Sequence, residues 1–117
     1  MVPLQILLIE DSEDDAELVL RAVRLGGYQP LAERFSSATE VRTALEKKTW
    51  DLVICDYVMP GFGGLEALEL FKQKGLDVPF IIVSGHIGEE VAVASLKAGA
   101  NDYVMKDRLA RLAPARP

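Results

Sequence analysis

Short apolar segments alternate with amphipathic segments five times along this chain. The apolar segments span residues 4–9, 29–35, 52–56, 78–84 and 102–105, and they predict strands. Segment 52–56 is rich in β-branched residues, which predicts a strand buried on both faces. Segment 29–35 alternates poorly and is expected at a sheet edge. The intervening segments carry apolar residues at helical spacing and end at glycines or charged residues. They predict helices over residues 13–25, 38–48, 65–74 and 89–98.

Strands that alternate with helices through short connections predict an α/β fold with a parallel sheet covered on both faces. Right-handed crossovers favour a flavodoxin-like, doubly wound sheet with strand order 2-1-3-4-5. The 117 residues fit one domain, with an expected core over 4–112. Residues 113–117 are expected to form a tail or the truncated start of a fifth helix. That last helix is predicted to be short or missing, because Pro114 follows at most two turns.

Four of the five predicted strands lead into a charged or hydroxyl side chain. Glu10 and Asp11 follow the first strand, Asp56 ends the third, Ser84 ends the fourth and Lys106 follows the fifth. Because the carboxyl ends of parallel strands share one edge, these residues are expected to converge there. The predicted order makes the first and third strands neighbours, which places Asp11 beside Asp56.

This set of side chains indicates phosphoryl transfer onto an aspartate. Carboxylates crowded together repel one another unless a cation lies between them. Oxygen ligands without histidine or cysteine suit Mg²⁺, and Mn²⁺ would use the same ligands. A carboxylate nucleophile, a divalent cation, a lysine and a hydroxyl are together the parts that such a transfer needs.

Composition excludes several other classes of function. A net charge of −5 argues against nucleic acid as a direct ligand. No apolar run is long enough for a membrane span, and the N-terminus lacks the basic region of a secretory signal. The single cysteine, Cys55, excludes an internal disulfide, is expected to be a core thiol, and fits a cytoplasmic protein.

Four segments of the chain resemble the receiver domains of bacterial two-component response regulators, the CheY-like superfamily. They are Leu-Leu-Ile-Glu-Asp at 7–11, Leu-Val-Ile-Cys-Asp-Tyr-Val-Met-Pro-Gly at 52–61, Ile-Ile-Val-Ser-Gly at 81–85 and Ala-Gly-Ala-Asn-Asp-Tyr-Val-Met-Lys at 98–106. Found together in this order, they are specific to the family, and the resemblance extends over residues 4 to about 112.

The resemblance implies roles for individual residues. Asp56 would be the phosphoacceptor and a ligand of Mg²⁺. Asp11 would bind the ion directly, Glu10 would act largely through water, and the backbone carbonyl of Val58 would be a further ligand.

The same resemblance implies a phosphate-contacting pair and a switch pair. Ser84 and Lys106 would contact the phosphoryl group. Ser84 would also move on phosphorylation, and Tyr103 would turn inward with it.

Two further positions would tune hydrolysis of the phosphorylated form. They are Val58, two residues after the phosphoacceptor, and His86, two residues after Ser84. A β-branched apolar Val58 should hinder an attacking water, so phospho-Asp56 is expected to be long-lived. Taken alone, His86 is interpreted as a loop residue rather than a ligand or base.

Function and partners follow from the resemblance as expectations. The domain would be a phosphorelay signalling switch that catalyses only its own phosphorylation and dephosphorylation. A sensor histidine kinase, a phosphotransfer protein or a small acyl phosphate would be the donor. An output domain would lie in the same or another chain, without direct contact with nucleic acid or membrane. A short last helix would uncover apolar surface and favour a homodimer.

Other functions are less well supported. A receiver-like docking module that works without phosphorylation is disfavoured, because every acidic, serine and lysine position is filled. A phosphatase of the haloacid dehalogenase type needs a second acid where Val58 stands. A serine hydrolase built on Ser84 and His86 lacks the nucleophile-elbow pattern.

The acidic run after Asp11 has a simpler interpretation. Glu13, Asp14, Asp15 and Glu17 are expected to favour the helix N-terminus through the helix dipole. The run does not match a calcium loop, because alanine stands where that loop needs glycine.

One position departs from the family pattern. Receivers usually have proline after the lysine, often with a cis bond, whereas Asp107 stands here. A cis bond before a residue other than proline costs about 3 kcal/mol, so a trans Lys106–Asp107 bond is predicted.

Overall fold

The computed structural model describes residues 2–57, 62–85 and 89–112. Five parallel strands form one sheet in the order β2-β1-β3-β4-β5, which confirms the predicted topology and places β2 at an edge. The strands are β1 (Val2–Ile9), β2 (Tyr28–Phe35), β3 (Leu52–Asp56), β4 (Phe80–Ser84) and β5 (Asp102–Met105).

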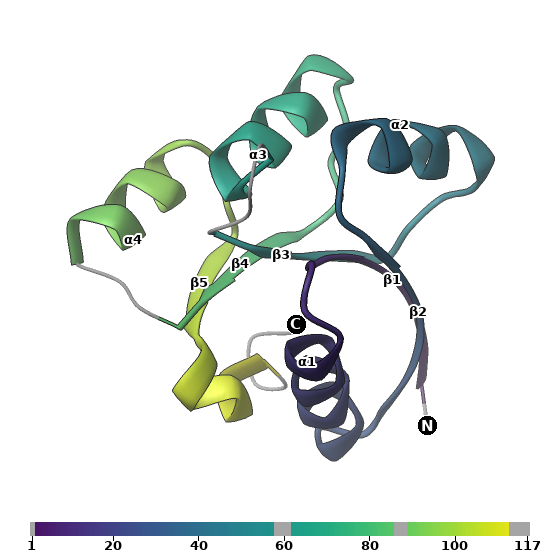
Figure 1. Ribbon diagram of the computed structural model, residues 1–117, viewed down its shortest axis with the longest axis vertical. Helices are drawn as coiled ribbons and strands as arrows, with labels where there is room; N and C mark the ends of the chain where they lie inside the picture. Colours follow the sequence, from purple (N-terminus) through teal and green to yellow (C-terminus); the bar gives the residue numbers. More distant parts are fainter. Residues whose placement is uncertain (1, 58–61, 86–88, 113–117) are drawn as a thin grey trace.

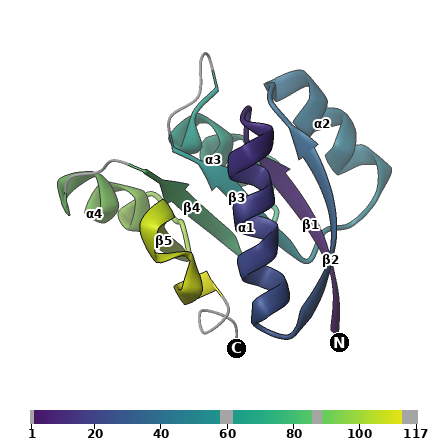
Figure 2. The same ribbon diagram turned by 60° about the horizontal axis from the view of Figure 1, so that its bottom comes forward.

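Helices cover both faces of the sheet (Figures 1 and 2). Helices α2 (Ala38–Lys47), α3 (Gly64–Gln73) and α4 (Glu89–Lys97) lie on one face. Helix α1 (Glu13–Leu25) and the 3₁₀ helix η1 (Lys106–Leu112) lie side by side on the other. None of the described helices has the length and apolar character that crossing a bilayer requires.

Serine side chains set where the first two helices begin. Ser12 Oγ accepts a hydrogen bond from the Asp15 N–H at 3.2 Å and caps α1. Ser37 Oγ accepts a hydrogen bond from the Glu40 N–H at 3.2 Å and caps α2. The Glu40 carboxylate in turn accepts from the Ser36 N–H, and this bond lowers the pKa of Glu40.

Strand β3 is buried on both faces, as predicted from its apolar sequence. Val53 and Cys55 belong to the core under α2, α3 and α4, whereas Ile54 belongs to the core under α1. Burial raises the pKa of the Cys55 thiol well above its usual value, so this cysteine stays protonated. It is therefore a core residue, as expected.

Element boundaries differ from the predictions by one or two residues in most cases. Strand β1 begins at Val2, two residues before its predicted start, and β4 begins at Phe80, two residues after its predicted start. Pro79 has no N–H to donate to a neighbouring strand, although its carbonyl still accepts from the Val53 N–H at 2.9 Å.

The last described element is short, as predicted. Helix η1 contains a kink at Arg108 (φ −131°, ψ 37°), and Leu109 packs onto the core under α1. The Lys106–Asp107 peptide bond is trans, which confirms that prediction. The packing of η1 against α1 brings the start of α1 near the end of β5, where Lys106 lies.

Replacing Ile54 by alanine should destabilise the fold by about 2–5 kcal/mol, because its side chain is fully buried between β1, β4 and α1. Urea unfolding followed by the fluorescence of buried Trp50 would measure the change. Leu25→Ala is the control: Leu25 is 80% exposed, so its loss should change stability by no more than about 0.5 kcal/mol. Equal effects of the two substitutions would contradict this assignment of the core.

Candidate functional site

Three carboxylates lie together at the carboxyl end of the sheet. Oxygens of Glu10, Asp11 and Asp56 all fall within 4.8 Å of one another. The parallel pairing of β1 with β3, with Ile9 opposite Cys55, brings the ends of these two strands side by side. Glu10 is 2% exposed and Asp56 is 7% exposed, whereas Asp11 is open to solvent. The structure thus places these three residues together at the predicted edge.

Glu10 lies in a setting that disfavours its charged form. Burial raises its pKa to about 7, and the hydrogen bond with Asp56 and the charge of Asp56 act in the same direction. Lys106 and the Ser12 N–H, which donates to Glu10 Oε1 at 3.2 Å, oppose the rise. Near neutral pH, Glu10 is therefore easily protonated, and a bound cation would displace its proton.

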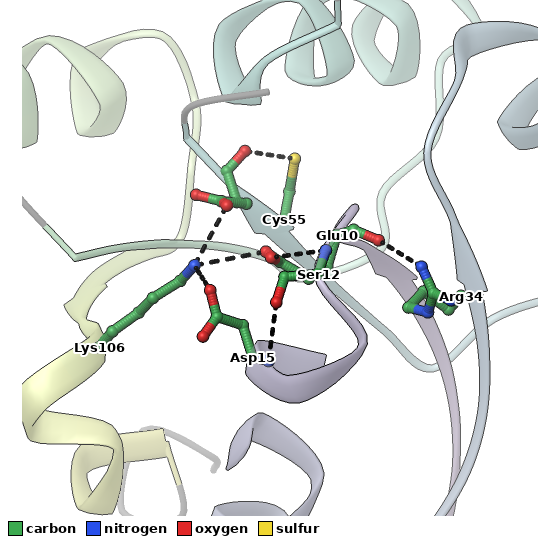
Figure 3. Close-up of polar contacts among 7 residues, drawn as sticks. Glu10, Ser12, Asp15, Arg34, Cys55 and Lys106 are labelled. Carbon is green, nitrogen blue, oxygen red and sulfur yellow. Dashed lines mark hydrogen bonds and ion pairs between the residues drawn. The ribbon is translucent and has the colours of Figure 1, made fainter. Parts of the chain in front are cut away.

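Among the described residues, the ammonium group of Lys106 faces the carboxylates (Figure 3). Lys106 Nζ lies 2.7 Å from Asp15 Oδ2, 3.2 Å from Asp56 Oδ2 and 3.5 Å from Glu10 Oε2. Burial disfavours its charge, but the hydrogen bonds with Asp15 and Asp56 and the charges of Asp56 and Glu10 outweigh burial and raise the pKa of Lys106. Lys106 therefore stays positively charged beside the carboxylates of Glu10, Asp15 and Asp56.

Asp15 makes a contact that the sequence analysis did not predict. It lies in the first turn of α1, as expected of an acid that favours the start of a helix, and it also makes the shortest contact with Lys106 Nζ, at 2.7 Å. A signal was present in the sequence: Asp15 stands three residues after the cap Ser12, in the first turn of α1. Helical side chains lean toward the N-terminus, so a first-turn side chain points back to the strand end that precedes the helix.

Ser84 and Tyr103 lie within the protein at the ends of neighbouring strands. Ser84 is buried at the end of β4, and Tyr103 is buried on β5 with its ring 6.3 Å from that of Tyr57. Burial raises the pKa of Tyr103, and a hydrogen bond with Ser84 opposes the rise. The two residues predicted to switch together are therefore in contact, and in this structure the tyrosine ring faces inward.

Arg34, on the neighbouring edge strand, adds a contact that was not predicted. Its Nη1 donates to the backbone carbonyl of Glu10 at 3.2 Å and so braces the end of β1. Val58 and His86 lie outside the described residues. The metal-binding carbonyl of Val58 and the effect of both residues on hydrolysis remain predictions.

The arrangement suits a divalent cation. The cluster of Glu10, Asp11 and Asp56 offers carboxylate oxygens alone, which Mg²⁺ and Mn²⁺ prefer. Lys106 Nζ lies within 3.5 Å of carboxylate oxygens of Glu10, Asp15 and Asp56. An anion bound at Asp56 could therefore be contacted by both the cation and the ammonium group.

Proteins of known sequence resemble this chain closely. A family model described as the response regulator receiver domain matches residues 6–114. The chain is 32% identical over 105 residues to the phosphate regulon transcriptional regulatory protein PhoB of Klebsiella pneumoniae, covering 87% of this chain and 44% of that protein. It is 34% identical over 101 residues to the DNA-binding transcriptional regulator NtrC of Salmonella typhimurium, covering 86% of this chain and 21% of that protein. The chain thus spans less than half the length of either relative.

The fold is also similar to that of solved structures. A two-component response regulator of the LuxR family from Aurantimonas matches with a TM-score of 0.82 and 30% sequence identity. The match covers 96% of this chain and 81% of that one. The similarity therefore extends over nearly the whole chain.

The affinity of the site for Mg²⁺ should rise with pH through neutrality, because Glu10 must lose its proton when the ion binds. With a pKa of about 7, binding measured by titration calorimetry should be about tenfold weaker at about pH 6 than at about pH 8. Glu10→Gln should bind Mg²⁺ more weakly and should lose most of this pH dependence. An unchanged pH dependence in the variant would assign the proton to another group.

Proposed function

Because this chain belongs to the response regulator receiver domain family, we propose that it is a signalling switch that accepts a phosphoryl group on Asp56 with Mg²⁺ bound beside it. The observation that carries the proposal is the position of Asp56. Its carboxylate is nearly buried, lies within 4.8 Å of the oxygens of Glu10 and Asp11, and has Lys106 Nζ at 3.2 Å.

The reaction requires a nucleophile and groups that offset negative charge. A carboxylate oxygen of Asp56 attacks the phosphorus of a phosphohistidine or a small acyl phosphate and forms a new phosphorus–oxygen bond. The bond between phosphorus and the leaving group breaks, and the leaving group, the histidine or the carboxylate, takes the electron pair. Lys106 neutralises charge on the phosphoryl oxygens. Asp11, Asp56 and, largely through water, Glu10 would hold Mg²⁺, which would supply further positive charge at these oxygens.

The switch itself is proposed to lie in Ser84 and Tyr103. The Ser84 hydroxyl donates to a phosphoryl oxygen once Asp56 is modified, and in doing so changes its contact with Tyr103. Tyr103 packs in the same core as Val91 and Ala92 of α4, so a change at Tyr103 reaches that helix. Val93 and Leu96 of α4 are about half exposed and offer apolar surface to a partner or a second copy.

The partners follow from this role. A sensor histidine kinase or a phosphotransfer protein is proposed as the donor. The named relatives PhoB and NtrC are transcriptional regulators, and much of their length lies outside the part matched here. An output domain in the same or another chain is therefore proposed to read the state of the switch.

Incubation with Mg²⁺ and a small acyl phosphate should add one phosphoryl group to the protein, detected by intact mass. The adduct should be absent without Mg²⁺ and absent in Asp56→Asn, because the reaction needs both the cation and the nucleophile. Urea unfolding of the Asp56→Asn protein confirms that the variant is folded. No adduct on the folded wild-type protein would favour instead a docking module that works without phosphorylation.

The phosphorylated form should be long-lived, because the β-branched side chain of Val58 hinders the water that hydrolyses phospho-Asp56. Val58→Asn should accelerate dephosphorylation, since an amide can orient that water. The decay of the phosphorylated mass after removal of the donor measures the rate. Equal rates in the two proteins would remove Val58 as the cause.

A further inference from the structure

We propose that Asp15 is a positioning residue for phosphoryl transfer, which holds the ammonium group of Lys106 in place when the carboxylates around Asp56 are occupied by a cation. The proposal rests on the function proposed above for Asp56. It assigns a role to an acidic residue of α1 that lies outside the carboxylate cluster.

The contact between Asp15 and Lys106 joins two distant parts of the chain. At 2.7 Å, it is the shortest of the three contacts that Lys106 Nζ makes with carboxylates. Figure 3 shows the two side chains meeting from the start of α1 and the end of β5. Two contacts fix the backbone at Asp15. Its N–H donates a hydrogen bond to Ser12 Oγ, and the next residue, Ala16, is buried in the core. The carboxylate therefore projects from a rigid first turn.

The three partners of Lys106 are not equivalent. Glu10 and Asp56 belong to the carboxylate cluster that could hold a metal ion, and Asp15 does not. A divalent cation in that cluster engages the oxygens of Glu10 and Asp56 and also repels the nearby ammonium group. Among the described residues that contact Lys106 Nζ, Asp15 alone then keeps its full charge available to the lysine.

Asp15 can hold the lysine without blocking its reaction. An ammonium group has three donors, so one bond to Asp15 leaves two for oxygens at Asp56. A free lysine side chain samples many rotamers, and a fixed partner reduces the loss of freedom when the phosphoryl group arrives. The lysine is 19% exposed and its partner 37% exposed, so water weakens this ion pair but does not replace it.

The alternative is that Asp15 acts only as a helix-start acid. Asp14 provides the matched control, since it lies in the same turn of α1, is exposed and carries the same charge. Asp14→Asn and Asp15→Asn change the helix dipole interaction and the net charge alike. Only Asp15→Asn removes the charged partner of Lys106.

Two measurements at saturating Mg²⁺ test the proposal: the affinity for beryllium fluoride, a stable mimic of the phosphoryl group, and the initial rate of Asp56 phosphorylation by a small acyl phosphate. Asp15→Asn should weaken the affinity for beryllium fluoride and slow the phosphorylation of Asp56, each by about threefold to fivefold. This is the size of effect expected for one partly exposed ion pair. Asp14→Asn should stay close to the wild type, and Asp15→Glu should recover most of the loss. Urea unfolding should show similar stability for the two asparagine variants.

The outcomes separate the inference from the function on which it rests. If wild-type protein is phosphorylated and Asp15→Asn matches Asp14→Asn, the positioning role is overturned while the switch stands. If Asp15→Asn binds beryllium fluoride more tightly, Asp15 competes with the phosphoryl group and the proposal is wrong. If the wild type forms no adduct, the proposed function fails and the role of Asp15 fails with it.

Discussion

The ammonium group of Lys106 balances carboxylates that the fold forces together at one end of the sheet. It lies within 3.5 Å of oxygens from Glu10, which follows β1, from Asp15 in α1 and from Asp56 at the end of β3. Without a cation at this place, burial and mutual repulsion would favour protonated acids. Burial, the hydrogen bond with Asp56 and the charge of Asp56 raise the pKa of Glu10 more than Lys106 lowers it. The site is thus prepared for a second cation and for an anion that both cations can contact.

The position of the carboxylates depends on the register of strands buried on both faces. Ile6 and Leu8 of β1 face the core under α1, whereas Leu7 and Ile9 face the core under α2, α3 and α4. A slip of one residue would exchange the two sets and disturb both cores, so the register of β1 against β3 is strongly specified. The ends of the two strands, and with them Glu10 and Asp56, are therefore held side by side by packing rather than by any attraction between the acids.

The position of the lysine depends on a different part of the fold. Lys106 follows the short strand β5 and begins η1, which packs against α1 through Leu109. The same helix α1 carries Asp15 in its first turn, so one packing contact sets both members of the ion pair. On the other face, Tyr103 connects Ser84 to the core beneath α4. The site is thus in contact with both layers of helices.

Sequence alone determined the strand order, the buried character of β3 and the convergence of Glu10, Asp11 and Asp56. These features follow from the alternation of apolar and amphipathic segments and from the rule that parallel strands end at one edge. The motif segments also led to the correct family. Local rules likewise predicted the trans bond at Lys106 and the short last element.

Tertiary structure alone decided which of the acids near the start of α1 belongs to the site. Asp14 and Asp15 are neighbours of the same type, and both are compatible with the helix dipole. Only the packing of η1 against α1 brings Lys106 to Asp15, a contact between residues 91 positions apart. The hydrogen bond from Arg34 to the backbone carbonyl of Glu10 has the same origin. Such contacts depend on the three-dimensional orientation of side chains from separate elements, which hydrophobic periodicity does not encode.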